Sequence, residues 1–149
     1  MITRICLNEK ERIDHTAKLF GILFPLRLEP FIFDMAGRLS MDYQGGYWEM
    51  YQLSNGGFYM APDEDIPFTV SSENGYQGTM SADAFGITIC MYAFSHLSFS
   101  DNPELAETCA EQFHLLKEYM FVSGVLKWVF FRRFESVSSS VLPSSSFPL

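Results

Sequence analysis

Two aromatic segments separated by a glycine-containing turn constrain this chain more than any other feature. Residues 47–53 and 58–61 are rich in aromatic and apolar side chains, and residues 54–57 between them read Ser-Asn-Gly-Gly. Aromatic residues are enriched in strands. Asn-Gly favours a hairpin, because a type I′ turn needs positive φ at both central residues. The pattern therefore predicts an antiparallel β-hairpin.

A second Asn-Gly pair, Asn74 and Gly75, predicts another hairpin between residues 68–71 and residues 76–80. Proline has no N–H to donate to a neighbouring strand. Pro67 therefore restricts the strand after it to a sheet edge, or to a strand that begins at this point. Together the two hairpins predict an antiparallel meander of about four strands.

Helical spacing precedes the hairpins. After Pro30, apolar residues recur at i, i+3, i+4 and i+7: Ile32, Met35, Ala36 and Leu39. This stripe predicts a helix that ends near residues 40–43, with Pro30 at its first position, where a missing N–H is tolerated. Residues 22–28 are apolar but interrupted by Pro25, so we expect them to be extended or irregular.

Two longer helices are predicted after the second hairpin. Ser81 is a good N-cap, and Asp83 in the first turn suits the positive end of the helix dipole. Pro103 begins the last helix, with Asp101 or Asn102 as its cap. The expected fold class is α+β: a single domain in which the meander sheet packs with three or more helices.

The charge balance limits the partners of the chain. Ten Lys and Arg against eighteen Asp and Glu give a net charge of −8, which argues against stable binding of nucleic-acid phosphates. The acidic residues are scattered along the sequence, which also disfavours imitation of DNA. One acidic cluster stands out, and we take it as the candidate partner-binding loop: Asp63, Glu64 and Asp65.

Cysteine usage and apolar runs indicate the compartment. Cys6, Cys90 and Cys109 form no CxxC pair, and an odd count without framework spacing fits a reducing environment. The N-terminus lacks the apolar region of a signal peptide. The uncharged residues 84–100 are too few and too polar to span a membrane. We expect a soluble, cytoplasmic protein and a monomer.

No residue pattern nominates a reactive centre. His15, His96 and His114 form no close ligand pair, so no metal and no cofactor is expected. Nucleophile-elbow and phosphate-loop patterns are absent from the sequence. Paired carboxylates stay open, with Glu49 and Asp83 as the candidates.

Two ordered blocks carry a family resemblance. Residues 43–51 and 53–62 read YQGGYWEMY and LSNGGFYMAP, and residues 74–78 and 80–87 read NGYQG and MSADAFGI. These blocks resemble the signature of the ArdB/KlcA antirestriction family. The resemblance implies a small α+β protein of plasmids, prophages or other mobile elements that protects unmodified DNA from type I restriction-modification enzymes. Its implied partners are subunits of those enzymes or a host factor. Family members are not known as enzymes and differ from acidic DNA mimics.

The motif residues are interpreted as mainly structural, with no catalytic set among them. They are Gly45, Gly46, Tyr47, Trp48, Asn55, Gly56, Gly57, Phe58, Tyr59, Ser81 and Asp83. Two alternatives stay open: a small enzyme that uses polar motif residues such as Glu49, Asn55 or Asp83, and a decayed, inactive family copy.

The match to the family also suggests the domain limits. We expect an N-terminal extension over residues 1–18 and the antirestriction domain over residues 19–122. Residues 123–149 diverge from the family pattern, and a disordered Ser- and Pro-rich tail is expected from about residue 136.

Overall fold

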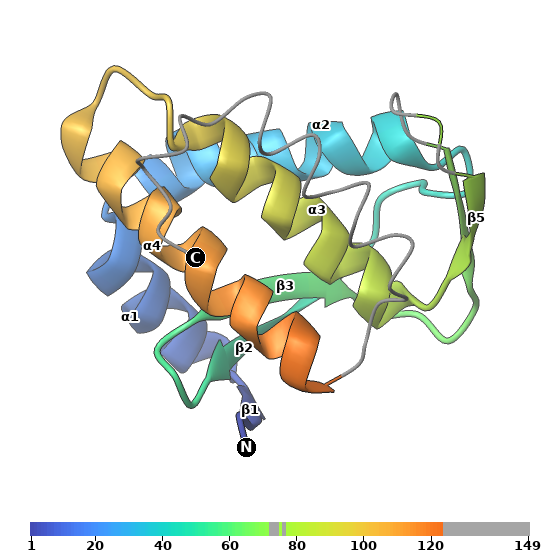
Figure 1. The fold of residues 1–149 in the computed structure, drawn as a ribbon, viewed down its shortest axis with the longest axis horizontal. Helices are drawn as coiled ribbons and strands as arrows, with labels where there is room; N and C mark the ends of the chain where they lie inside the picture. Colours follow the sequence, from blue (N-terminus) through green and yellow to red (C-terminus); the bar gives the residue numbers. More distant parts are fainter. Residues whose placement is uncertain (72–74, 76, 124–149) are drawn as a thin grey trace.

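The computed structural model describes residues 1–71, 75 and 77–123 and has the α+β architecture expected from the sequence (Figure 1). In chain order, the elements are β1 (Arg4–Cys6), α1 (Glu9–Phe20), the π-helical turn η1 (Phe24–Leu28), α2 (Glu29–Leu39), β2 (Trp48–Leu53), β3 (Phe58–Pro62), β4 (Phe68–Ser71), β5 (Gln77–Met80), α3 (Ala82–Leu97) and α4 (Pro103–Ser123).

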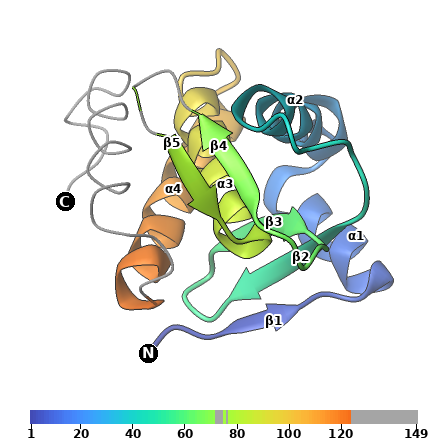
Figure 2. The ribbon, with the colours of Figure 1, turned by 90° about the vertical axis from the view of Figure 1, so that its right-hand side faces the viewer.

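The strands divide between two small antiparallel sheets. One sheet has the order β1-β2-β3, and the other pairs β4 with β5. Met50 lies opposite Met60 in the first hairpin, and Phe68 lies opposite Met80 in the second. The predicted hairpins are confirmed, whereas the single four-stranded meander is wrong. Figure 2 shows the two strand pairs in different orientations.

The connection between the hairpins explains this separation. Pro67 directly precedes β4 and has no N–H to pair with another strand. The next outward N–H, that of Thr69, donates to the Asp42 carboxylate at 2.7 Å instead of to a β3 carbonyl. A side chain from before β2 therefore satisfies the edge of β4.

The N-terminal region contains a strand and a helix before η1. β1 pairs with β2, so residues 4–6 add an edge strand that the sequence patterns did not reveal. Asn8 then begins α1 with a capping box, in which its side chain accepts from the Glu11 N–H and the Glu11 side chain accepts from the Asn8 N–H. Residues 1–18 thus contain β1 and most of α1, and the domain limit at residue 19 stays a prediction.

Residues 22–28 are not extended, which corrects a second expectation. Phe24–Leu28 form η1, and this turn continues directly into α2. Pro25 stands in the first positions of η1, where its missing N–H removes no helical hydrogen bond. The helix predicted after Pro30 is confirmed, although α2 already begins at Glu29 and ends at Leu39, one residue before the predicted end.

The later helices begin where their caps predicted. The Ala84 N–H donates to Ser81 Oγ at 3.1 Å, and the Leu105 N–H donates to Asn102 Oδ1 at 3.0 Å. α3 lies between α2 and α4 and packs on β3 (Figure 1). Most of its side chains are therefore buried. No helix within the described ranges is long and apolar enough to cross a membrane.

Parts of two expectations lie outside the described residues. One is the divergent C-terminal segment, beyond residue 123, with its tail. The other concerns Asn74 in the second turn and Tyr76 at the start of the strand after it, although Gly75 between them has the positive φ of 92° that such a turn requires.

Candidate functional site

The first hairpin turn is fastened to α4. Asn55 Oδ1 accepts a hydrogen bond from the Gly57 N–H at 2.9 Å, and Asn55 Nδ2 donates to the Leu115 carbonyl at 3.0 Å. Gly56 has a φ of 94°, and its carbonyl accepts from Gln112 Nε2 at 3.2 Å. The polar groups of this turn are therefore engaged in holding β2 and β3 against α4.

A second group of polar motif residues joins β1, β3 and α3. The Tyr59 hydroxyl donates to Asp83 Oδ1 at 2.7 Å and accepts a hydrogen bond from Arg4. Arg4 also forms a salt bridge of 2.6 Å with Asp83, and its guanidinium lies over the Tyr51 ring. Burial and the hydrogen bond to Asp83 raise the pKa of Tyr59 well above its usual value, so the phenol stays protonated. This network fixes the N-terminal strand to the sheet and to the start of α3.

The aromatic and glycine residues before β2 have separate positions. Trp48 is buried and donates through its indole N–H to the Tyr43 hydroxyl at 3.1 Å. Gly45 and Gly46 both have positive φ, at 88° and 111°. A Cβ on Gly46 would lie 4.0 Å from Glu64 Oε1, which places the glycine pair beside the acidic loop.

The three thiols have the wrong electrostatics for activated nucleophiles. The hydrogen bond that Cys6 donates to Glu49, at 2.8 Å, and partial burial raise the pKa of this thiol. Burial raises the pKa of Cys90 and of Cys109 to about 12. A reactive cysteine needs a lowered pKa, so all three favour the neutral thiol form at neutral pH.

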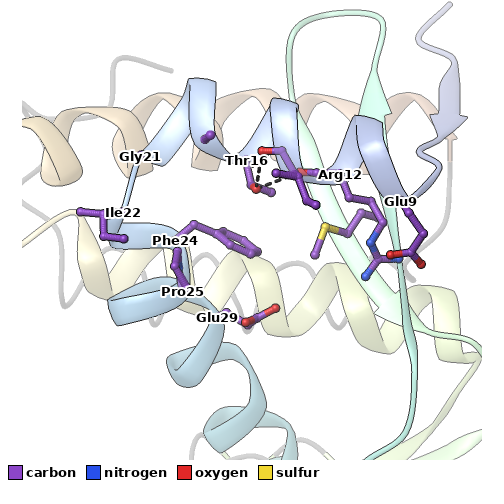
Figure 3. Close-up of a pocket in the computed structure, with 11 residues that line it drawn as sticks. Glu9, Arg12, Thr16, Gly21, Ile22, Phe24, Pro25 and Glu29 are labelled. Carbon is purple, nitrogen blue, oxygen red and sulfur yellow. Dashed lines mark hydrogen bonds between the residues drawn. The ribbon is translucent and has the colours of Figure 1, made fainter.

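An open pocket of about 460 Å³ lies between α1, η1 and the start of α2 (Figure 3). Its lining is mainly apolar and reaches Met50 on β2. It consists of Glu9, Arg12, Ile13, Thr16, Ala17, Gly21, Ile22, Phe24, Pro25, Glu29 and Met50. Figure 3 shows Glu9 and Arg12 at one end and Ile22 at the other, with Phe24 and Glu29 on the opposite wall from α1.

The polar end of this pocket meets the sequence motif at Tyr47. The Tyr47 hydroxyl accepts a hydrogen bond from Arg12 and donates one to Glu9, both at 2.8 Å. The Tyr47 carbonyl accepts from the Asp63 N–H at 2.9 Å. The exposed loop of Asp63, Glu64 and Asp65 therefore lies next to the motif residue that holds Arg12.

Glu29 is the unusual charge in the pocket. Burial raises its pKa, and the positive charge of Arg12 opposes this shift only in part. Within the part of the chain that the structure describes, the Glu29 carboxylate has no salt bridge or hydrogen bond. A half-buried carboxylate in apolar surroundings without a partner is unfavourable, and a bound cationic group would stabilise it.

Sequence reasoning missed this pocket, because its lining comes mostly from residues before the motif. A usable signal exists in hindsight: Glu29 is one of only two charged residues in the apolar residues 22–33, and it directly precedes Pro30. Among the described residues, no group of three or more His, Cys, Asp or Glu side chains is placed to hold a metal ion.

The chain is similar to known proteins over much of its length. A family model described as Antirestriction protein matches residues 41–123. An antirestriction protein KlcA of Escherichia coli is 42% identical over 92 residues, which cover 60% of this chain but less than two thirds (63%) of that relative. Another Escherichia coli KlcA is 33% identical over 121 residues, covering 79% of this chain and 84% of the relative.

A solved structure extends the similarity to the fold. It is described as showing that the KlcA and ArdB proteins have a novel fold and antirestriction activity against type I DNA restriction systems in vivo but not in vitro. It matches this chain with a TM-score of 0.75 and 31% identity, over 89% of this chain and 94% of that one. Since the family model covers more than half of the sequence, the chain belongs to the antirestriction protein family.

Proposed function

We propose that this chain protects unmodified incoming DNA from type I restriction-modification enzymes through an interaction that is neither catalytic nor an imitation of DNA. The main observation that supports this proposal is the similarity to the KlcA and ArdB structure over 89% of the chain. Those proteins have activity against type I DNA restriction systems in vivo but not in vitro. Because the activity is found in vivo but not in vitro, we consider a host factor as a target in addition to the enzyme subunits.

The geometry of the motif supports a non-catalytic role. An enzyme hypothesis would use polar motif residues such as Asn55 and Asp83. Asn55 is hydrogen-bonded to α4, and Asp83 is bonded to Arg4 and Tyr59. Cys6 and Glu49 could in principle act as nucleophile and base, but the raised pKa of Cys6 disfavours this role. We therefore assign binding to the surface of the pocket and the acidic loop.

The placement of charge supports a mechanism other than DNA imitation. A mimic needs carboxylates at a regular spacing comparable to one charge per about 1.7 Å of DNA axis. Here Glu9 and Glu29 lie in a mainly apolar pocket, and the acidic cluster of residues 63–65 is confined to one short loop. Such a surface fits recognition of a protein.

Plating of unmodified phage on cells with a type I system tests the proposal. Cells that express this chain should plate the phage with an efficiency approaching that of a non-restricting host, because restriction is relieved. Phage DNA recovered from these cells should still be methylated, since a binder that does not imitate DNA leaves the DNA-binding subunits free.

Two outcomes would contradict the proposal. Unchanged plating with folded, soluble chain in the cells would remove the antirestriction function. Equal loss of restriction and methylation would instead point to occupation of the DNA-binding subunits, as expected of a mimic.

A further inference from the structure

We propose that the exposed face of α1 around Ala17 and Gly21 is a docking site for a positively charged amphipathic helix of a partner protein. The biological role of this docking site rests on the proposed function, although the binding itself can be tested separately. The shape, the apolar exposure and the charge of this face carry the proposal.

Two grooves meet on this face. The pocket described above lies on one side, and a second groove, also of about 460 Å³, lies between α1 and α4. Its lining is Ala17, Lys18, Leu19, Phe20, Gly21, Leu23, Glu104, Leu105, Glu107, Thr108 and Glu111. Ala17 and Gly21 line both grooves, and their small size keeps the ridge between the grooves low. A helix laid across a low ridge can place side chains into the grooves on both sides.

Apolar side chains are exposed along the first groove. Ile13 and Ile22, which line it, are 69% and 68% exposed. Leu26, one residue beyond the lining Pro25, is 63% exposed. Apolar groups of this size gain from being covered by another apolar surface. An amphipathic helix supplies such a surface through residues spaced at i, i+3, i+4 and i+7.

The charges around the grooves favour a basic helix. Five carboxylates line the two grooves against two cations. The carboxylates are Glu9, Glu29, Glu104, Glu107 and Glu111, and the cations are Arg12 and Lys18. A third cation, Arg27, lies near enough to Cys109 to oppose the rise of its pKa, and the balance remains negative. Arg12 is already bound to Tyr47, so it does not neutralise Glu29 by direct contact.

Glu29 gives the docked helix a specific contact. Its half-buried carboxylate lacks a salt bridge among the described residues, and a Lys or Arg of the incoming helix would supply one. The same acidic grooves would repel nucleic acid and anionic lipid. The chemistry on this face therefore selects a cationic protein segment.

Titration of the full chain with model peptides, followed by NMR of backbone amides, tests this inference. The main probe is an amphipathic Leu/Lys peptide of about 20 residues, long enough to form a helix. Two matched peptides replace Lys by Glu or Leu by Ser. We expect saturable shifts at Ala17, Gly21 and Ile22 with the Leu/Lys peptide only, because binding needs both the apolar stripe and the cations.

Variants locate the contact. Ala17→Gln, which raises the ridge without adding charge, should weaken binding about tenfold, corresponding to about 1.4 kcal/mol. Glu29→Gln should weaken it several-fold. Asp34→Asn is the matched control, because it also removes one negative charge from α2. Asp34 forms a salt bridge with Arg38 in which both side chains are about two-thirds exposed, so this variant should leave peptide binding unchanged. A dispersed amide spectrum confirms the folding of each variant, and Ile22→Ser replaces Ala17→Gln if the latter does not fold.

Several results would overturn the inference. The first is that the peptide with Glu in place of Lys, or the peptide with Ser in place of Leu, binds as well as the Leu/Lys peptide. The second is that the peptide shifts only residues 63–65, or binds the Ala17 or Ile22 variant as well as the unaltered chain. The third is a concentration-dependent shift at Ala17 without peptide, which would indicate binding of a second copy of the chain. Protection in the plating test without peptide binding would contradict this inference but not the proposed function. Peptide binding without protection would contradict the proposed function but not the docking site.

Discussion

Replacing Gly86 with alanine should lower the free energy of unfolding by about 3 kcal/mol, near the upper end of overpacking effects. A Cβ at this position would lie 2.3 Å from Ala61 Cβ, 2.4 Å from Ala61 Cα and 2.5 Å from the Met60 carbonyl oxygen. Two of these three atoms belong to the backbone of β3, so no side-chain rotation can relieve the clash. α3 would have to move away from β3, and the helix is buried along most of its length.

Thermal and urea unfolding measure this effect. For a chain of this size, about 3 kcal/mol corresponds to a fall in Tm of roughly 6–12 °C. Gly37→Ala is the matched control, because a Cβ on Gly37 in α2 would meet no atom within 4 Å. Since alanine favours helix over glycine, this control should be neutral or up to about 1 kcal/mol more stable. A Gly86→Ala protein as stable as the Gly37→Ala protein would show that α3 and β3 are not in such close contact.

Phe58→Ala should destabilise the fold by about 3–5 kcal/mol, the range for removal of a large aromatic side chain from a core. Phe58 is 0% exposed. Its ring centroid lies 6.1 Å from that of Phe20 on α1 and 6.2 Å from that of Phe24 on η1. The substitution leaves a cavity where the hairpin, α1 and η1 meet, and rigid neighbours on three elements cannot all close it.

The same unfolding measurements apply to this variant. Phe58→Leu keeps much of the volume and should be intermediate. Phe99→Ala, at a position 45% exposed, removes an identical side chain and should cost less than about 1 kcal/mol. Similar losses at positions 58 and 99 would mean that Phe58 does not join the hairpin to the N-terminal helices.

Local features of the fold were predictable from the sequence, because their causes lie within a few residues. The Asn55-Gly56 turn, the Ser81 cap and the Pro103 helix start each depend on neighbouring backbone geometry, and each is present. The family resemblance agrees with the same blocks, since they contain the turn and cap residues.

Longer-range features were not predictable in this way. The separation of the two sheets depends on Asp42 reaching the Thr69 N–H across 27 positions. β1 depends on pairing with β2, and its three residues carry no periodic pattern of their own. The pocket combines residues 9–29 with Met50, so its existence follows from tertiary packing. Asp63, Glu64 and Asp65 are exposed as a loop, and their role in partner binding stays a prediction.

The central claim is that the motif builds a scaffold whose surface acts by binding, without a reacting group. Plating of unmodified phage on type I-restricting cells that express either the wild-type chain or Glu49→Gln tests this most directly. The substituted amide keeps an oxygen that can accept from Cys6 but cannot act as a base, so we expect both chains to relieve restriction equally. If the Glu49→Gln chain has the Tm and expression level of the wild type but no longer protects the phage, the result would contradict this claim and point to catalysis at the hairpin.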